Sequence, residues 1–232
     1  MSKSVSICQP TYLPWLGYFE LIEKADTFVF LDHVQFEKQS WQCRNRLKGS
    51  NSAPFWITIP LEAHESKTPI NEIYLAKNKS NWARKHLQSI RMALSRAPFF
   101  DEIFPHLEEW LSSPHDRLAD LTIDGISRFC KLLDIGTPLI RSSTMDVDGC
   151  RSPLVIGILK NLDATCYRAN QGSKAYMTLD AHLFEAAGIS CEYQDWEHPQ
   201  YKQNQGEFIS HLAFPDALCH LGLDEVKSIL KD

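Results

Sequence analysis

The 232-residue sequence contains little that would place the protein in a membrane or outside the cell. No apolar run approaches the roughly 18 residues of a membrane-spanning helix. Residues 1–4 lead directly into a strand-like run, without the longer apolar segment of a signal peptide. The seven cysteines are odd in number and scattered, and none forms a CxxC pair, which argues against a zinc ribbon or a thioredoxin motif. The sequence therefore predicts a cytoplasmic protein with reduced thiols.

Excess positive charge and metal-binding patterns are also missing. The formal net charge is −5, so the chain lacks the overall positive field that attracts proteins to nucleic acid. The sequence has no HExxH and no His-x-His pattern. We therefore expect no nucleic-acid partner and no catalytic metal.

Strand-like and helix-like runs alternate along most of the chain. The strand-like runs cover residues 5–8, 27–32, 55–60, 70–75, 137–141, 164–168 and 189–193. The helix-like runs cover residues 20–25, 82–96, 104–111, 117–133, 152–162, 179–187 and 224–230. Run 27–32 is nearly all apolar, which is typical of a parallel strand covered on both faces. With no repeat or linker in the sequence, we predict one domain over residues 1–232, an α/β fold whose mainly parallel sheet carries helices on both faces around a Rossmann-like core.

The loop between the first strand-like run and the first helix-like run is rich in proline and aromatic residues. It contains Gln9, Tyr12 and Trp15. Ligands commonly bind where such a loop leaves the carboxyl end of a parallel strand. We interpret Gln9, and Gln35 after the second strand, as amides that orient a substrate, and Tyr12 and Trp15 as an aromatic wall. The alternative is a rigid turn that only anchors the first helix.

Two short polar segments are candidates for binding phosphate. Arg44 and Arg46, with Lys38 and Lys48 nearby, form the densest basic cluster in an acidic chain, and arginine binds phosphate oxygens bidentately. The other segment, Gly172-Ser173-Lys174, follows a strand-like run and precedes a helix. The alternatives are a solvated surface strand for the arginines and a simple turn for the glycine loop.

Two histidines are candidates for the general base. His198 lies in a polar-aromatic segment beside Asp195 and Glu197, which could orient it, and His33 follows a predicted strand end beside Asp32. Either one could instead be an ordinary loop histidine. Cys8 ends the first strand, where a cysteine is more often a small buried side chain than a nucleophile.

Several of these segments together resemble the WbqC-like protein family. The similarity is carried by QPTYLPWLGYF (9–19), ADTFVFLDHVQF (25–36), RNR (44–46), PFF (98–100), GSKAY (172–176) and HPQYKQ (198–203). It spans nearly the whole chain. Cys8 departs from the pattern, since several members carry His or Ser there, and residues 208–218 match the usual ending loosely.

The resemblance implies a cytoplasmic transferase of bacterial surface-polysaccharide (O-antigen) biosynthesis that modifies a nucleotide-linked amino sugar. The reaction we expect is acyl or aminoacyl transfer to the sugar amine. It implies a nucleotide-sugar substrate, an acyl or aminoacyl thioester as donor, and an acyl carrier protein as a candidate partner. Two alternatives remain: a nucleotidyltransferase-like enzyme, which the chain resembles distantly but without the His-x-Gly-His loop, and a non-enzymatic scaffold of the pathway.

Overall fold

The computed structural model describes residues 3–77, 81–204 and 206–232. Its strands are β1 (Ser4–Cys8), β2 (Thr27–Phe30), β3 (Arg44–Lys48), β4 (Pro54–Thr58), β5 (Leu139–Arg141), β6 (Cys166–Ala169) and β7 (Ser190–Tyr193). Its α-helices are α1 (Leu16–Glu23), α2 (Trp82–Leu94), α3 (Phe100–Ser112), α4 (Leu118–Leu132), α5 (Arg151–Asn161), α6 (Lys174–Leu179), α7 (Ala181–Ala186), α8 (Pro215–Leu221) and α9 (Leu223–Lys231). Among the described residues, no helix is long and apolar enough to cross a membrane.

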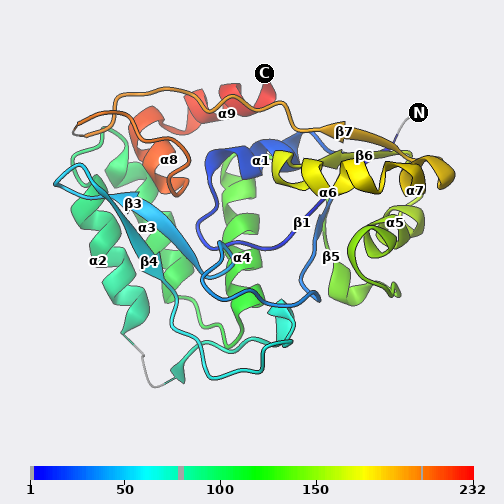
Figure 1. Ribbon diagram of the computed structural model, residues 1–232. Coiled ribbons are helices and arrows are strands. Elements are labelled where there is room, and N and C mark those ends of the chain that lie inside the picture. The colour runs from blue at the N-terminus through cyan, green and yellow to red at the C-terminus, as the bar shows by residue number, and fades with distance from the viewer. Residues whose placement is uncertain (1–2, 78–80, 205) are drawn as a thin grey trace.

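Five strands form a parallel sheet in the order β5-β2-β1-β6-β7. From β1 the chain first builds outward on one side, through β2 to β5. It then returns to the other side of β1 for β6 and β7 (Figure 1). The direction of winding reverses between β1 and β6, which makes the gap between their carboxyl ends the topological switch point of the sheet.

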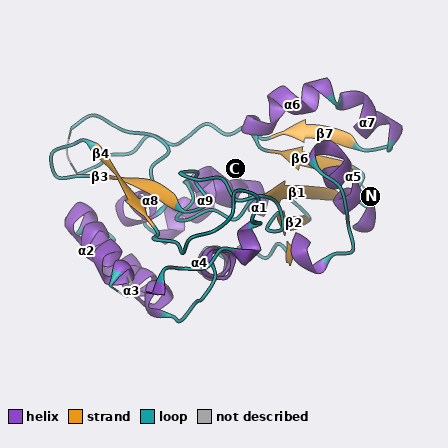
Figure 2. Ribbon diagram, turned by 60° about the horizontal axis from the view of Figure 1, so that its bottom comes forward, coloured by secondary structure: helices purple, strands orange, loops and turns teal. Residues whose placement is uncertain are grey.

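Helices lie on both faces of this sheet (Figure 2), and each face has its own apolar core. On one face, the rings of Phe28 and Phe30 pack with residues of α1, α4, α8 and α9. On the other face, Val29 joins Val5, Ile7 and residues of α5 and α7. Alternate residues of β2 thus enter opposite cores, which explains its unbroken apolar sequence. The predicted α/β architecture is confirmed.

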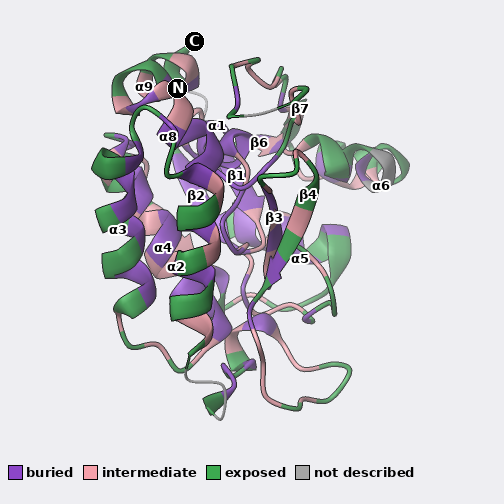
Figure 3. Cartoon of the chain, turned by 90° about the vertical axis from the view of Figure 1, so that its left-hand side faces the viewer, coloured by how far each residue is buried: buried purple, intermediate pink, exposed green. Residues whose placement is uncertain are grey.

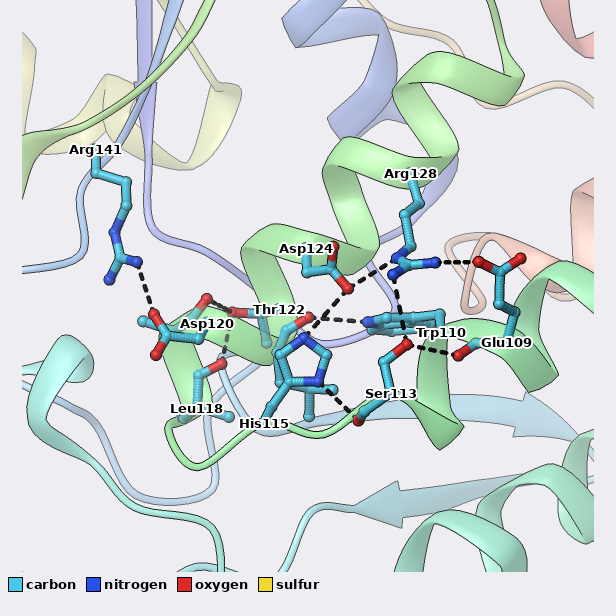
Figure 4. Close-up of polar contacts among 12 residues, drawn as sticks. Glu109, Trp110, Ser113, His115, Leu118, Asp120, Thr122, Asp124, Arg128 and Arg141 are labelled. Atoms are coloured by element: carbon cyan, nitrogen blue, oxygen red, sulfur yellow. Dashed lines mark hydrogen bonds and ion pairs between the residues drawn. The ribbon is translucent and has the colours of Figure 1, made fainter.

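The long connection from β2 to β5 holds the antiparallel β3–β4 hairpin and the helices α2, α3 and α4. The inner sides of these helices are buried, whereas their outer sides face solvent (Figure 3). Trp110 of α3 lies against Gly125 of α4, where a Cβ atom would come within 2.2 Å of the indole ring. Its indole N–H donates to the Leu121 carbonyl at 2.9 Å. Arg128 reinforces the pair by contacting Glu109 at 2.7 Å and Asp124 at 2.8 Å (Figure 4).

The last part of the chain ties the hairpin to the parallel sheet. After β7 an extended segment crosses the molecule to α8 and α9, which lie near α1 and α3 (Figure 1). The amide of Ala213 donates to the Arg46 carbonyl at 3.0 Å, and that of Phe214 donates to the Pro14 carbonyl at 2.8 Å. The Phe214 ring packs edge-to-face against Phe19 and Phe129. The C-terminal segment is therefore part of the main core.

One local prediction was wrong, and two elements were not predicted. Residues 70–75 do not form a strand, because the chain turns in a short 3₁₀ helix at Ile70–Glu72 and pairs only through isolated bridges. The polar segment around residue 46 is strand β3, since its alternate residues Asn45 and Leu47 are buried. Helix α8 was missed altogether.

Candidate functional site

A cleft of about 820 Å³ opens at the switch point of the parallel sheet. Most of its lining comes from four segments, residues 7–18, 37–46, 170–173 and 194–211, and we call it the switch-point cleft. The first and third of these segments follow the carboxyl ends of β1 and β6. The second includes the start of β3, and the fourth follows β7. The sheet topology thus places the cleft where α/β proteins commonly bind their ligands.

The loop after β1 is held rigidly by contacts with the hairpin. Leu13 has a left-handed backbone (φ 48°), which is costly for a side chain of this kind, and its carbonyl accepts a hydrogen bond from the buried Asn45 amide. The backbone amide of Tyr12 donates to the Trp41 carbonyl at 3.0 Å. Tyr12 itself is fully buried, and its hydroxyl is 2.8 Å from Nδ1 of His86. Tyr12 therefore anchors the loop and does not border the cleft.

Trp15 forms an aromatic wall of the cleft. Its ring lies 4.9 Å from the His211 ring and 6.3 Å from the Trp196 ring, measured between centroids. Gly17 makes this position available, because a Cβ there would come within 2.0 Å of the Trp15 ring. All four residues border the cleft. The wall thus combines residues from opposite ends of the chain.

The two arginines of strand β3 differ in position. Arg46 borders the cleft, and its guanidinium carbon lies 5.8 Å from the ring centroids of both Trp41 and Trp56. Arg44 does not border the cleft, since its guanidinium stacks over Trp56 at 4.2 Å. Residues 44 and 46 lie on the same side of the strand. Only Arg46 borders the cleft because the two arginines stand at different points along the strand. Arg46 supplies a positive charge directly at the cleft.

The loop after β6 contributes backbone and small side chains. The Asn170 carboxamide oxygen accepts from the Ser173 amide at 2.9 Å and from the Ser173 hydroxyl at 3.0 Å. This closes a tight turn that brings Gly172 and Ser173 to the cleft. Lys174 starts α6 and extends elsewhere, with Nζ 5.5 Å from the Tyr193 ring. It is not among the residues that border the cleft.

A different histidine from the predicted ones borders the cleft. His211 lines it, and burial together with the positive charge of Arg46 lowers the pKa of His211. His198 lies behind it, with ring centroids 4.9 Å apart, and burial lowers the pKa of His198 as well. The Nδ1 of His198 donates to the Pro199 carbonyl at 3.0 Å. The two rings form a pair, of which only His211 lines the cleft.

His33 and Gln35 lie outside the cleft. Nδ1 of His33 is 2.6 Å from the Ser142 hydroxyl, in a cluster that joins the ends of β2 and β5. At its centre the fully buried Asp32 carboxylate contacts Arg141 Nε at 2.7 Å and accepts from the Ser143 amide at 2.9 Å. The Gln35 amide donates to the Ser66 carbonyl at 2.7 Å. These contacts hold strand ends and loops together.

Several buried polar atoms at the cleft have no hydrogen-bond partner among the described residues. They are Nε of Arg46, Nε1 of Trp196 and Oγ1 of Thr11. Leaving buried donors unpaired costs free energy, so groups of this kind usually have a partner in the working molecule. Arginine and indole N–H groups are donors only. The cleft is therefore suited to a ligand rich in hydrogen-bond acceptors, such as phosphate and sugar oxygens.

Cys8 borders the cleft but is not a ready nucleophile. Burial raises the pKa of the Cys8 thiol to about 11, so it carries no appreciable thiolate at neutral pH. Among the described residues, no group of three or more His, Cys, Asp or Glu side chains is placed to hold a metal ion.

Five cleft residues were not recognised from the sequence: Gln42, Asn45, Gln194, Trp196 and His211. Asn45 lay within a segment noted for its arginines, and its burial depends on a strand that was not predicted. Gln194 directly follows β7, so its place at a strand end was a signal that the sequence offered. His211 reaches the cleft only because the chain crosses the molecule after β7, and no local pattern in the sequence carries that information.

Comparison with known proteins identifies the family of the chain. The uncharacterized protein Rv1507c of Mycobacterium tuberculosis is 28% identical over 225 residues, which make up 96% of this chain and 95% of that protein. No solved structure matches the chain. The model of the WbqC-like protein family matches residues 9–228, a span that includes nearly all of the segments around the cleft. The chain therefore belongs to the WbqC-like protein family.

Proposed function

We propose that the protein is a cytoplasmic transferase that binds a nucleotide-linked amino sugar in the switch-point cleft. The observation that carries the proposal is the set of unpaired donors at the cleft, Arg46 Nε and Trp196 Nε1, in a cleft that the loop of Gly172 and Ser173 also lines. An arginine fork and a turn of backbone amides are a common combination for phosphate. The Trp15 wall offers an apolar face for a sugar or base ring.

The reaction we propose is transfer of an acyl or aminoacyl group from a thioester to the sugar amine. The amine nitrogen attacks the thioester carbonyl carbon, a C–N bond forms, and the C–S bond breaks with its electron pair leaving on sulfur. His211, kept neutral by its lowered pKa, takes the proton from the nitrogen and passes it to the thiolate. The pathway we propose is surface-polysaccharide synthesis, with coenzyme A or an acyl carrier protein as the thioester carrier.

Ligand-induced stabilisation tests the binding step. The wild-type protein is heated with dTDP-, UDP-, GDP- and CMP-sugars, ATP and coenzyme A thioesters. A ligand that binds only the folded state at a hundred times its dissociation constant adds about 2.7 kcal/mol to the free energy of unfolding, which raises the melting temperature. We expect this rise with a nucleotide-sugar.

The matched variants are Arg46→Ala and Arg44→Ala. Both remove an arginine from the same side of β3, but only Arg46 borders the cleft. We expect Arg46→Ala to lose the rise in melting temperature and Arg44→Ala to keep it. Equal behaviour of the two variants would contradict the proposed position of the phosphates. Release of pyrophosphate from ATP or CTP would instead support a nucleotidyltransferase, and a partner protein bound without any small ligand would support a scaffold.

A further inference from the structure

The carboxamide side chains at the cleft have defined orientations. An amide can be turned either way unless its partners decide which end is oxygen and which is nitrogen. A carbonyl or carboxylate partner accepts only, and a backbone N–H donates only. Contacts with such groups therefore determine whether an amide presents a donor or an acceptor to a ligand.

Gln194 presents an acceptor. Its Nε2 donates to the Gly17 carbonyl at 2.7 Å and to the Glu20 carboxylate, and both of these groups only accept. Both amide hydrogens are used in this way, and Oε1 has no hydrogen-bond partner among the described residues. Glu20 is held in place by Arg168 at 2.7 Å, and Gln194 is only 2% exposed. The carboxamide therefore cannot turn over without breaking two buried hydrogen bonds.

Gln9 and Asn170 present hydrogen-bond donors, whereas Gln194 presents an acceptor. The Glu37 backbone amide donates to Oε1 of Gln42 at 3.1 Å, so Nε2 of Gln42 must donate to Oε1 of Gln9, which lies 2.8 Å away. This leaves the Gln9 amide hydrogens for a ligand. In Asn170 the Ser173 amide occupies the oxygen, and Nδ2 makes only a long contact of 3.6 Å with Cys8 Sγ. Gln194 thus contributes an acceptor to a cleft in which Gln9 and Asn170 offer donors.

We propose that Gln194 is the residue that selects an amino sugar, by accepting a hydrogen bond from its N–H. This inference rests on the proposed function. An acceptor that holds one N–H orients the nitrogen and leaves its lone pair available for attack. A sugar with a ketone at the carbon that bears the amine has only an acceptor oxygen at that position. This oxygen would face Gln194 Oε1, another acceptor, and no hydrogen bond would form. The site therefore discriminates amine from ketone at one ring position.

The first test changes the ligand and leaves the protein intact. Dissociation constants are measured by calorimetry for the free nucleotide, the nucleotide-linked amino sugar and the ketone sugar with its carbonyl at the same carbon. The nucleotide used is the one that stabilises the wild type most among dTDP, UDP, GDP and CMP. We expect the amino sugar to bind about 10- to 100-fold more tightly than the ketone, as expected when a buried polar group is left unpaired. Equal affinity overturns the inference.

The second test removes the acceptor by the substitution Gln194→Met, in which the methionine side chain has a length similar to that of glutamine. The control is Gln203→Met, which removes another buried carboxamide from the same segment but one bonded to Lys48 and Asp216. We expect Gln194→Met to bind the free nucleotide like the wild type and to lose the preference for amine over ketone. The control is expected to keep that preference. Retention of the preference in Gln194→Met would overturn the inference.

The two proposals fail in different ways. If no nucleotide or nucleotide-sugar binds the wild type, the proposed function is overturned and the role of Gln194 falls with it. If nucleotides bind and Arg46→Ala abolishes binding, but the amine and the ketone bind equally, only the role of Gln194 is lost.

Discussion

At the scale of single residues, the chemistry that we propose for the cleft depends on a histidine whose positive charge is disfavoured. Burial and the nearby Arg46 guanidinium lower the pKa of His211 from its ordinary value of 6.5. A neutral imidazole accepts a proton, whereas an imidazolium does not. His211 is therefore in its basic form at neutral pH, and the same arginine that would bind phosphate keeps it so.

A pH profile tests this coupling. In the wild type we expect transfer to be constant through neutral pH and to fall as pH drops through the lowered pKa of His211. Arg46→Gln removes the positive charge, so the fall should move to higher pH. His211→Asn should reduce turnover by about two to four orders of magnitude.

His198 and His33 provide the comparison for that experiment. His198→Ala should have a smaller effect, since its ring packs behind His211, and His33→Asn should leave the profile unchanged. Full turnover by His211→Asn, together with a large loss in His198→Ala, would move the base to His198.

At the scale of elements, the loop after β1 depends on helix α2. Tyr12 contacts Nδ1 of His86, whose ring lies 5.2 Å from that of Trp82 in the same helix. Burial lowers the pKa of His86 to about 4 from an ordinary value of 6.5. The unfolded chain therefore binds a proton at a pH where the folded chain does not, and acid favours unfolding.

This difference predicts a specific loss of stability on acidification. Between pH 6.5 and 5, His86 should lower the free energy of unfolding by about 2 kcal/mol, since the folded protein stays unprotonated there. Urea unfolding at several pH values measures the effect. In His86→Gln, which keeps an acceptor for the Tyr12 hydroxyl, that part of the pH dependence should be absent. If the free energy of unfolding of His86→Gln fell with pH as steeply as that of the wild type, other groups would cause the loss of stability.

The same elements show which parts of the fold could be predicted from sequence. Strand β2 of the parallel sheet is nearly all apolar, and its burial on both faces is visible in the residues themselves. The hairpin strand β3 has the sequence Arg44-Asn45-Arg46-Leu47-Lys48, and its burial depends on Leu13 and Gln203, which lie far away in the sequence. Tertiary contacts decide whether such a segment forms a buried strand, so the local sequence pattern could not predict it.

The same distinction applies to the cleft. The loops after β1 and β6 carry local signals, because proline, glycine and asparagine mark turns at strand ends. Gln194 carries a weaker signal, since it directly follows β7, and His211 carries none. Whether a polar residue in an irregular segment faces a cleft depends on where the rest of the chain places that segment.

At the scale of the whole molecule, the C-terminal segment holds the two halves of the cleft together. Phe214 lies in the core with Phe19 and Phe129, and its amide bonds to the loop after β1. We expect Phe214→Ala to lower the free energy of unfolding by about 3–5 kcal/mol, the usual effect of a buried phenylalanine. Leu179→Ala, at a side chain that is 78% exposed, should change it by less than about 0.5 kcal/mol.

The same Phe214→Ala protein should bind nucleotide-sugar more weakly at temperatures where it remains folded, because the loop after β1 loses its fixed position. Calorimetry at low temperature separates this effect from unfolding. Undiminished affinity in the folded variant would show that the loop holds its shape without the C-terminal segment.

The cleft is built from residues near both ends of the chain, with Gln9 on one side and His211 on the other. During synthesis on the ribosome, the loop after β1 emerges well before its partners on the far side of the cleft. A nascent chain therefore has no complete cleft until the segment around His211 has been made. A nucleotide-sugar that binds the cleft would stabilise chains that contain this segment over chains that stop before it.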